Sequence, residues 1–238
     1  MHLAILVTNT DDSDFAQNHP KDGEKFPTMM TRVRPDWSFA VFEVKDGQFP
    51  ETLDGFDGVM ISGSPASVHD DAPWIGRLFT LIDDIVARKL PLFGACFGHQ
   101  AIAMALGGRV EKNPGGYMHG LIQNRLIQRK PWMHTLPEDL KLYGSHVEQV
   151  TVLPEGASPV TSSEGCPIAG FAMGSHVYTS QHHPEMTPGF IAALTEELSE
   201  YLGPQVTGRA RASLAQTADS DAFAESIARF FEMAQPAS

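Results

Sequence analysis

Short apolar segments alternate with helical segments along the first half of the chain. Residues 3–7, 39–44, 58–61 and 90–95 each have the length and apolar character of a buried strand. The segment 74–89, which precedes the fourth of them, is predicted to form a helix. Strands that alternate with helices are typical of a parallel sheet covered on both faces, so we predict an α/β fold.

The second half of the chain contains shorter strands that are separated by turn residues. The predicted strands span residues 108–112, 119–127, 147–153, 159–162, 168–173 and 177–181. This spacing favours antiparallel pairing, so we predict a smaller antiparallel extension of the same domain. Helices are predicted over 187–202 and 219–234, with a Gly-, Pro-, Ser- and Thr-rich loop over 203–217 between them. We expect residues 1–238 to form one domain, with the helix over about 219–234 packed on it.

A long polar segment over residues 8–36 separates the first two predicted strands. It carries Asp11, Asp12 and Asp14, together with an apolar patch over 26–30. Long loops in compact domains are usually functional or mobile. Two interpretations are therefore open: a lid or substrate-facing segment, and a disordered surface loop.

The charge of the chain and its N-terminal segment indicate which binding partners and which targeting signals to expect. The chain has 17 Lys and Arg residues against 29 Asp and Glu residues, which gives a net charge of −12. No basic excess is present to neutralise phosphates, so we expect neither nucleic acid nor an anionic membrane as a partner. The N-terminal segment lacks the basic region of a signal peptide and the long apolar span of a membrane anchor.

The chain has two cysteines, Cys96 and Cys166, which form neither a disulfide framework nor a metal-binding pair. Reduced thiols are typical of a cytoplasmic protein, which is the location we expect. Cys166 lies in a predicted turn and is interpreted as a bystander thiol. No metal-ligand spacing such as H-E-x-x-H occurs, so we expect no catalytic metal and no cofactor.

The sequence Gly94-Ala-Cys96-Phe-Gly98 indicates a nucleophile elbow. It follows an apolar strand and precedes a run of helix formers over 100–106 that ends at glycine. Small flanking residues allow the sharp strand-to-helix turn that such an elbow requires. At the start of the helix, the partial positive charge favours a reactive thiolate, and the N–H of Phe97 would face an oxyanion formed beside the sulfur. The alternative is a buried structural cysteine in a parallel strand.

The segment Gln181-His-His-Pro-Glu185 offers the general base that a thiolate nucleophile needs. Side chains at positions i and i+2 of an extended segment lie on the same side, so His183 and Glu185 are expected to cooperate. Pro184 between them limits the freedom of the backbone. His182 is expected to point the other way, as a packing or surface residue.

Together these two motifs resemble the class I (triad) glutamine amidotransferases. A third motif, the strand and small-residue turn of Val59-Met-Ile-Ser-Gly-Ser-Pro65, resembles the turn with which that family binds the oxyanion, and the three occur in the family's order. The Ser62–Ile75 region and the Cys96–Gln100 run are similar to the γ-glutamyl peptidases, a single-domain branch. The resemblance implies a flavodoxin-like fold, with a mainly parallel central sheet covered by helices on both faces and a smaller antiparallel extension.

The resemblance also implies a role for each matching residue. Cys96 would attack the side-chain amide carbon of glutamine and form a γ-glutamyl thioester, which water then hydrolyses. His183 would deprotonate Cys96 and protonate the leaving amine, and Glu185 would orient His183. The N–H groups that hold the oxyanion would come from Phe97 and from Gly63 or Ser64.

Three further residues match positions beside the family's substrate. Gln100 would line the glutamine pocket. Ser145 and His146 lie in a segment whose backbone helps to bind the α-amino and α-carboxylate groups, and a purely structural loop is the alternative there. The common family turn has two glycines where this chain has Gly63-Ser64, which leaves open which N–H faces the oxyanion.

Three functions follow from these observations. The first is a cysteine-dependent hydrolase or transferase acting on a small molecule, either glutamine or a γ-glutamyl peptide. The second is the ammonia-donating glutaminase subunit of a two-protein synthetase, because no P-loop or acceptor-modifying domain is recognisable. The third is a non-enzymatic redox-sensing protein, which gives no purpose to His183 and Glu185. We predict the first.

Overall fold

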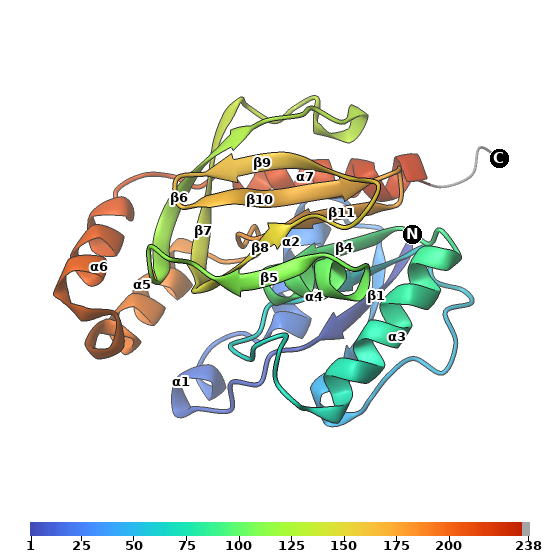
Figure 1. The fold of residues 1–238 in the computed structure, drawn as a ribbon, viewed down its shortest axis with the longest axis horizontal. Coiled ribbons are helices and arrows are strands. Elements are labelled where there is room, and N and C mark those ends of the chain that lie inside the picture. The colour runs from blue at the N-terminus through green and yellow to red at the C-terminus, as the bar shows by residue number, and fades with distance from the viewer. Residues whose placement is uncertain (235–238) are drawn as a thin grey trace.

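A nine-stranded mixed sheet runs through the centre of the structure, a computed structural model that describes residues 1–234 (Figure 1). The strand order is β2-β1-β3-β4-β11-β10-β9-β6-β7. The first five are parallel to one another: β2 (Ser38–Glu43), β1 (His2–Val7), β3 (Gly58–Ile61), β4 (Leu92–Ala95) and β11 (Val177–Ser180). The others pair antiparallel: β10 (Cys166–Met173), β9 (Ala157–Ser163), β6 (Met118–Leu126) and β7 (Asp139–His146). A separate antiparallel pair consists of β5 (Arg109–Lys112) and β8 (Glu148–Val152). The predicted α/β class with an antiparallel extension is confirmed.

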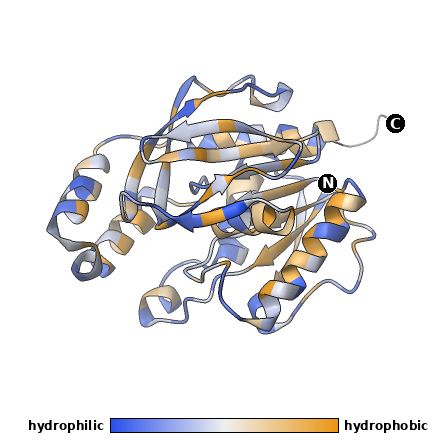
Figure 2. Ribbon diagram, viewed as in Figure 1, coloured by the Kyte–Doolittle hydropathy of each residue, from blue (hydrophilic) through white to orange (hydrophobic). Residues whose placement is uncertain are grey.

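Helices cover both faces of the parallel half of the sheet. Successive side chains of β1 point to opposite faces, and all of those from Leu3 to Val7 are buried. Leu3, Ile5 and Val7 face a core shared with α2 (Asp22–Val33) and α7 (Ser220–Ala234). Ala4 and Leu6 face the opposite core, shared with α3 (Pro73–Ala87) and α4 (Phe97–Ala105). Figure 2 shows hydrophobic and hydrophilic residues on different sides of α3, the pattern of a helix that packs on one side.

The remaining helices lie on the left-hand side of the view in Figure 1, beside the antiparallel end of the sheet and near the end of β1. They are α1 (Asp14–Gln17), α5 (Pro188–Glu197) and α6 (Ser199–Ser213), with short 3-10 helices at Val44–Asp46 and Pro131–Met133. The predicted C-terminal helix is present as α7, and Arg34 at the end of α2 holds it through ion pairs with Glu225 and Glu232. That residues 1–238 form one domain stays a prediction. Over residues 1–234, none of the helices combines the length and apolarity needed to cross a bilayer.

The interpretation of residues 8–36 as a loop is wrong. The segment forms α1 and α2, and α2 is the crossover helix that connects the parallel strands β1 and β2. Its buried apolar side chains, Phe26, Met29 and Met30, recur at helical spacing, and at the start of the helix the N–H of Lys21 donates to the carboxylate of Glu24 at 3.0 Å. Polar neighbours and an internal proline conceal this periodicity in the sequence.

Two further differences lie in the second half of the chain. The strand β7 was not predicted, although Leu140, Leu142 and Gly144 alternate along it and it pairs with β6 over its whole length. The predicted loop over 203–217 is wrong because α6 continues to Ser213, with a break only at Gly203, whose φ is 72°. A glycine followed by Pro204 ends one helical segment and begins the next. Cys166 is also not in a turn, since it begins β10 and is buried.

Candidate active site

Cys96 lies at a strained strand-to-helix turn between β4 and α4. Its φ of 50° makes it one of two non-glycine residues with positive φ among residues 1–234, the other being Lys89. Its N–H donates a hydrogen bond of 2.8 Å to the carbonyl of Ser180, at the end of the neighbouring strand β11. Strained backbone of this kind persists where the surrounding structure enforces it, and it concentrates at functional sites. The elbow geometry predicted around Cys96 is therefore present.

The glycines that flank Cys96 are required because the backbone packs tightly there. A Cβ at position 98 would lie 2.5 Å from the carbonyl oxygen of Ile61 in β3. A Cβ at position 94 would lie 2.6 Å from the backbone carbon of Gly98. Both distances are too short for any side chain, so the two glycines allow α4 to approach the sheet and set the position of Cys96.

We expect Gly98→Ala to lower the free energy of unfolding by about 1–3 kcal/mol or more, because its Cβ meets backbone that cannot rotate away. Urea unfolding measures this change. Gly76→Ala is the matched control: it lies in α3 with open space around it, and alanine there favours the helix. A Gly98→Ala protein as stable as the Gly76→Ala protein would contradict the close approach.

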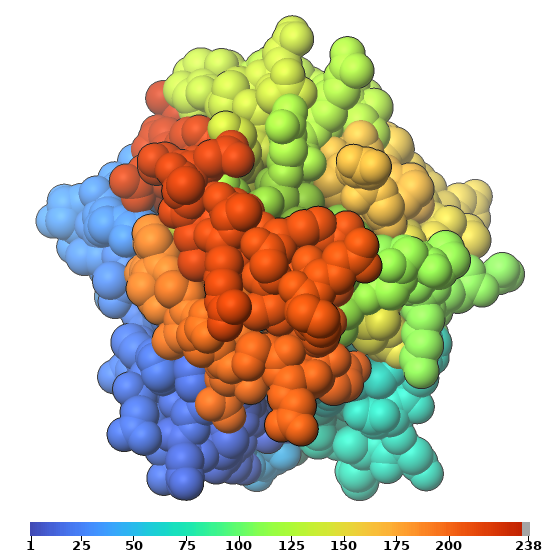
Figure 3. All heavy atoms as spheres, turned by 90° about the vertical axis from the view of Figure 1, so that its left-hand side faces the viewer, coloured from blue at the N-terminus to red at the C-terminus, as the bar shows by residue number. Residues whose placement is uncertain are grey.

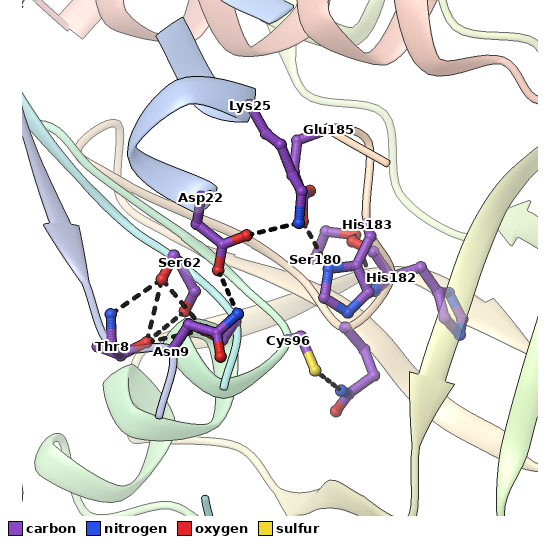
Figure 4. Close-up of polar contacts among 12 residues, drawn as sticks. Thr8, Asn9, Asp22, Lys25, Ser62, Cys96, Ser180, His182, His183 and Glu185 are labelled. Atoms are coloured by element: carbon purple, nitrogen blue, oxygen red, sulfur yellow. Dashed lines mark hydrogen bonds and ion pairs between the residues drawn. The ribbon is translucent and has the colours of Figure 1, made fainter. Parts of the chain in front are cut away.

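His183 and Glu185 form a buried pair on the loop that follows β11. Nδ1 of His183 lies 2.6 Å from Oε1 of Glu185, and the backbone N–H of His183 donates to the carbonyl of Tyr143 at 2.7 Å. Burial disfavours the charged imidazole, but the negative charges of Glu185 and Cys96 outweigh it and raise the pKa of His183 well above its ordinary value. In Figure 4 the His183 ring lies between the side chains of Cys96 and Glu185. The structure thus brings together the three residues predicted as a triad.

The turn after β3 lies against this group. A Cβ on Gly63 would be 2.8 Å from Cε1 of His183 and 3.5 Å from Cβ of Cys96. A buried network holds the turn: Thr8 donates its N–H to Oγ of Ser62 at 3.0 Å and its hydroxyl to the carbonyl of Gly63 at 3.1 Å (Figure 4). Phe97 is the first residue of α4, so its N–H has no acceptor within the helix. Residues predicted for oxyanion binding therefore lie on two sides of Cys96.

Cys96 and His183 line a cavity of about 520 Å³. Beside them the wall is formed by Gly63, Ser64, Tyr117 and Ser145. A mainly apolar wall comes from α1, from α5 and from the residues on either side of α5: Phe15, Ala16, Met186, Phe190, Leu194 and Leu198. Charged residues from the segment between β1 and α1, from α2 and from the end of β2 with the 3-10 helix after it also line the cavity, among them Asp11, Asp12, Asp22, Lys25, Glu43 and Lys45.

Residues 8–36 supply a large share of this cavity. The ring of Phe15 stacks on that of His19, with 4.1 Å between centroids, and both contact Phe190 of α5. Nζ of Lys25 lies 3.8 Å from the centre of the Phe190 ring. Figure 3 shows the N-terminal segment, in blue, beside α5 and α6, in orange, on this face of the molecule. Of the two interpretations, these contacts support the substrate-facing segment.

Two of the predicted substrate-binding residues do not reach the cavity. The amide of Gln100 donates to the carbonyl of Glu148 at 2.7 Å and to Oε1 of Gln181 at 3.1 Å. Gln100 does not line the cavity, and its contact with Gln181 holds a residue that does lie beside Cys96. His146 is buried, with Nδ1 at 3.0 Å from the same carbonyl and its ring beside that of His182. Ser145 alone of these lines the cavity. His182 points away as expected, and contacts Asn124 at 2.7 Å.

Several residues at the site were not predicted. Nε2 of Gln181 lies 3.7 Å from Sγ of Cys96. The alternation that relates His183 to Glu185 also places Gln181 on the same side, so this signal was available in the sequence. Tyr117 comes from the loop between β5 and β6, and Phe15 comes from α1. No local pattern marks them, because only the tertiary fold brings these segments to Cys96.

Comparison with known proteins gives consistent matches. The model of the family described as glutamine amidotransferase class-I matches residues 30–193. Gamma-glutamyl peptidase 3 of Arabidopsis thaliana is 35% identical over 153 residues, 61% of this chain and 61% of that protein. A glutamine-hydrolysing GMP synthase of Thermotoga maritima is 34% identical over 166 residues, 69% of this chain and 31% of the synthase. The chain thus spans about three fifths of the length of the peptidase and about a third of the synthase.

A solved structure supports the same fold. The crystal structure of a glutamine amidotransferase from Thermotoga maritima aligns with a TM-score of 0.78 at 20% identity, and the alignment covers 98% of each chain. At this identity the likeness establishes the arrangement of strands and helices, and the chemistry has to be argued from the site itself.

Proposed function

The chain belongs to the class-I glutamine amidotransferase family, and from this premise we propose that it is a cysteine-dependent hydrolase of γ-glutamyl amides. The bond in question is the one that glutamine and γ-glutamyl peptides share. The observation that carries the proposal is the strained Cys96 on the wall of a large cavity, beside the buried His183–Glu185 pair. A nucleophile, a base and an orienting carboxylate in this order make up a catalytic triad.

In the proposed mechanism, Sγ of Cys96 attacks the γ-carbonyl carbon of the substrate. The imidazolium of His183 gives its proton to the leaving nitrogen, and the C–N bond breaks to leave a γ-glutamyl thioester and a free amine. Water then attacks the thioester while His183 accepts its proton, which releases glutamate and restores the thiolate–imidazolium pair. Glu185 holds Nδ1–H of His183 throughout, so that Nε2 serves the reacting atoms.

Each attack places negative charge on the carbonyl oxygen. Backbone N–H groups that are already in place stabilise such an oxyanion without reorganising, and removal of one donor typically slows a reaction by about 10²–10³-fold. We propose the N–H of Phe97 and that of Gly63 or Ser64 for this role. Their support is the position of Gly63 against both Cys96 and His183 and the location of Phe97 at the start of α4.

The cavity favours donors whose leaving group is larger than ammonia. Its volume of about 520 Å³ is within the range of sites that enclose whole small molecules. Aromatic rings from α1 and α5 line part of the same cavity, and we assign the leaving amine to that part. We therefore propose γ-glutamyl peptides or related γ-glutamyl amines as the preferred donors, and glutamine as a poorer one.

The test is release of glutamate by the purified protein from glutamine, from γ-glutamyl-alanine and from α-glutamyl-alanine. We expect γ-glutamyl-alanine to give the highest kcat/KM, and the α-linked isomer, which has the same composition, to give none. Glutamate release from the α-isomer at a similar rate, or from no γ-glutamyl compound at all, would overturn the proposal. Preference for glutamine over the dipeptide would overturn the choice of donor alone.

The similarity to part of a GMP synthase favours a second candidate, an ammonia-donating subunit that acts with a synthetase partner. This function predicts slow glutamine hydrolysis by the isolated chain and a marked increase when the partner is added. High turnover of glutamine by the chain alone would count against it.

A further inference from the structure

Three aromatic rings from two separate segments meet on one side of the cavity. Phe15 and His19 come from α1 and the residues after it, and Phe190 lies in the first turn of α5. The rings of Phe15 and His19 stack with 4.1 Å between centroids, and the Phe190 ring lies 5.8 Å from the first and 5.7 Å from the second. All three line the cavity and are only partly buried. This aromatic cluster therefore has ring surface left to offer to a bound molecule.

The aromatic cluster is held in place by its polar neighbours. Nδ1 of His19 lies 2.8 Å from the carbonyl oxygen of Phe15, which can only accept, so His19 donates to it. Nζ of Lys25 lies 3.8 Å from the centre of the Phe190 ring, within the range of a cation–π contact. An ion pair of 3.0 Å with Asp22 fixes Lys25, and only 9% of the Lys25 side chain is exposed (Figure 4). The rings are thus positioned before a substrate binds, which reduces the entropic cost of binding.

The loop that carries His183 leads to this cluster. In the proposed mechanism His183 gives its proton to the leaving nitrogen, so the amine must depart on the side of the cavity that His183 lines. From His183 the chain continues through Met186 to Phe190 and Leu194, and all four residues line the cavity. A substituent on the leaving nitrogen therefore has an apolar wall beside it that includes Phe190.

Much of this wall lies outside the part of the chain that the family model matches, which is residues 30–193. Phe15 and His19 precede that part, and Leu194 and Leu198 follow it. Membership of the family therefore does not account for the aromatic cluster.

We propose that the aromatic cluster binds an aromatic ring carried by the leaving amine. The preferred donors are then γ-glutamyl derivatives of amines that bear such a ring, aromatic amino acids among them, and the products are glutamate and the free amine. An incoming ring can pack edge-to-face or offset against rings that are already positioned, and these contacts add to the benefit of burying apolar surface. This inference rests on the proposed function, since it names the leaving group of the same reaction.

The experiment compares glutamate release from γ-glutamyl-phenylalanine, γ-glutamyl-cyclohexylalanine and γ-glutamyl-alanine. All three leave the same thioester on Cys96, so differences in kcat/KM between them arise from the leaving amine. We expect the phenylalanine derivative to exceed the alanine derivative by about tenfold or more, the scale of a filled apolar pocket. It should exceed the cyclohexylalanine derivative, which is apolar and of similar size but has no π-system, by about three- to tenfold.

Two substitutions test the rings themselves. Phe15→Leu and Phe190→Leu each keep an apolar side chain and remove one ring, so each should reduce the preference for the phenylalanine over the cyclohexylalanine derivative severalfold. Phe49→Leu is the matched control. Phe49 also has a cation over its ring, with Cζ of Arg77 at 4.1 Å from the ring centre, but it does not line the cavity. The preference should therefore be the same in Phe49→Leu as in the wild-type protein.

Equal kcat/KM for the phenylalanine and cyclohexylalanine derivatives would overturn the proposal, because apolar burial alone would then explain the wall. A preference that persists at the wild-type value in the leucine variants of the cluster would overturn it as well. Phe15 and Phe190 lie on different segments, so one variant tests the cluster even if the other does not fold. Failure of the proposed function is distinguishable: the wild-type protein would then release glutamate from none of the three donors, which would overturn both.

Discussion

Substitution of Cys96 by alanine is expected to reduce glutamate release from every γ-glutamyl substrate by at least about 10⁴-fold, the scale seen when a catalytic nucleophile is removed. The proposed thioester cannot form without Sγ, and no other thiol lines the cavity. The fold should survive, because alanine removes only the sulfur and the turn already tolerates a Cβ at this position. Residual substrate binding is expected, since the cavity walls are unchanged. Glutamate release under saturating substrate, with thermal unfolding as the check on folding, measures the effect.

Cys166 provides the matched control for this prediction. It is buried at the start of β10, and burial raises the pKa of its thiol to about 12, so it is a poor nucleophile at neutral pH. Iodoacetamide should therefore label one cysteine per molecule and stop activity in step with the labelling. Cys166→Ala should still be labelled and inactivated, whereas Cys96→Ala should take up no label. Full activity in Cys96→Ala, or labelling that occurs at Cys166 first, would refute the assignment.

The sequence was most informative where local physics and the tertiary fold agree. The β3 strand was predicted at its observed bounds because its four residues are all buried, and such a run has few alternatives. The elbow at Cys96 was predictable because its glycines are needed by the backbone itself. His183 and Glu185 were predictable because a single local rule, alternation across an extended segment, brings them together.

Prediction failed where the deciding contacts come from distant segments. The polar helix α2 owes its position to three buried side chains that pack on β1 and α7, which short-range composition does not reveal. Gln100 was assigned to the substrate pocket on resemblance, but its amide is held by Glu148 and Gln181. Tyr117 lines the cavity just before β6, and its hydroxyl contacts Ser145 of β7, a strand that was not predicted. The residues that line the cavity could therefore be identified only from the structure.

Substitution of Glu185 by glutamine should lower kcat/KM by about 10²–10⁴-fold, which is the range expected when the orienting carboxylate of a triad is neutralised. Glu185 is buried, accepts from Nδ1 of His183 through Oε1, and has no partner at Oε2 among the residues described. A glutamine there places an amide N–H₂ in the same buried space. If the glutamine amide donates a hydrogen bond to Nδ1 of His183, the neutral imidazole must carry its own hydrogen on Nε2. Nε2 then has no lone pair with which to accept the proton of the attacking water.

The pH dependence of kcat/KM should also change in Glu185→Gln, and the direction of that change can be predicted. Burial lowers the pKa of His183, but the charges of Glu185 and Cys96 prevail and raise it, so the wild-type protein keeps the imidazolium to unusually high pH. Without the Glu185 charge the pKa of His183 falls, and the alkaline limb of kcat/KM should move to lower pH. Glu196→Gln on α5 is the control, because it removes a carboxylate from an exposed ion pair with Arg211 and should leave both rate and profile unchanged. A slow Glu185→Gln protein with an unshifted alkaline limb would show that Glu185 positions the segment without charging His183.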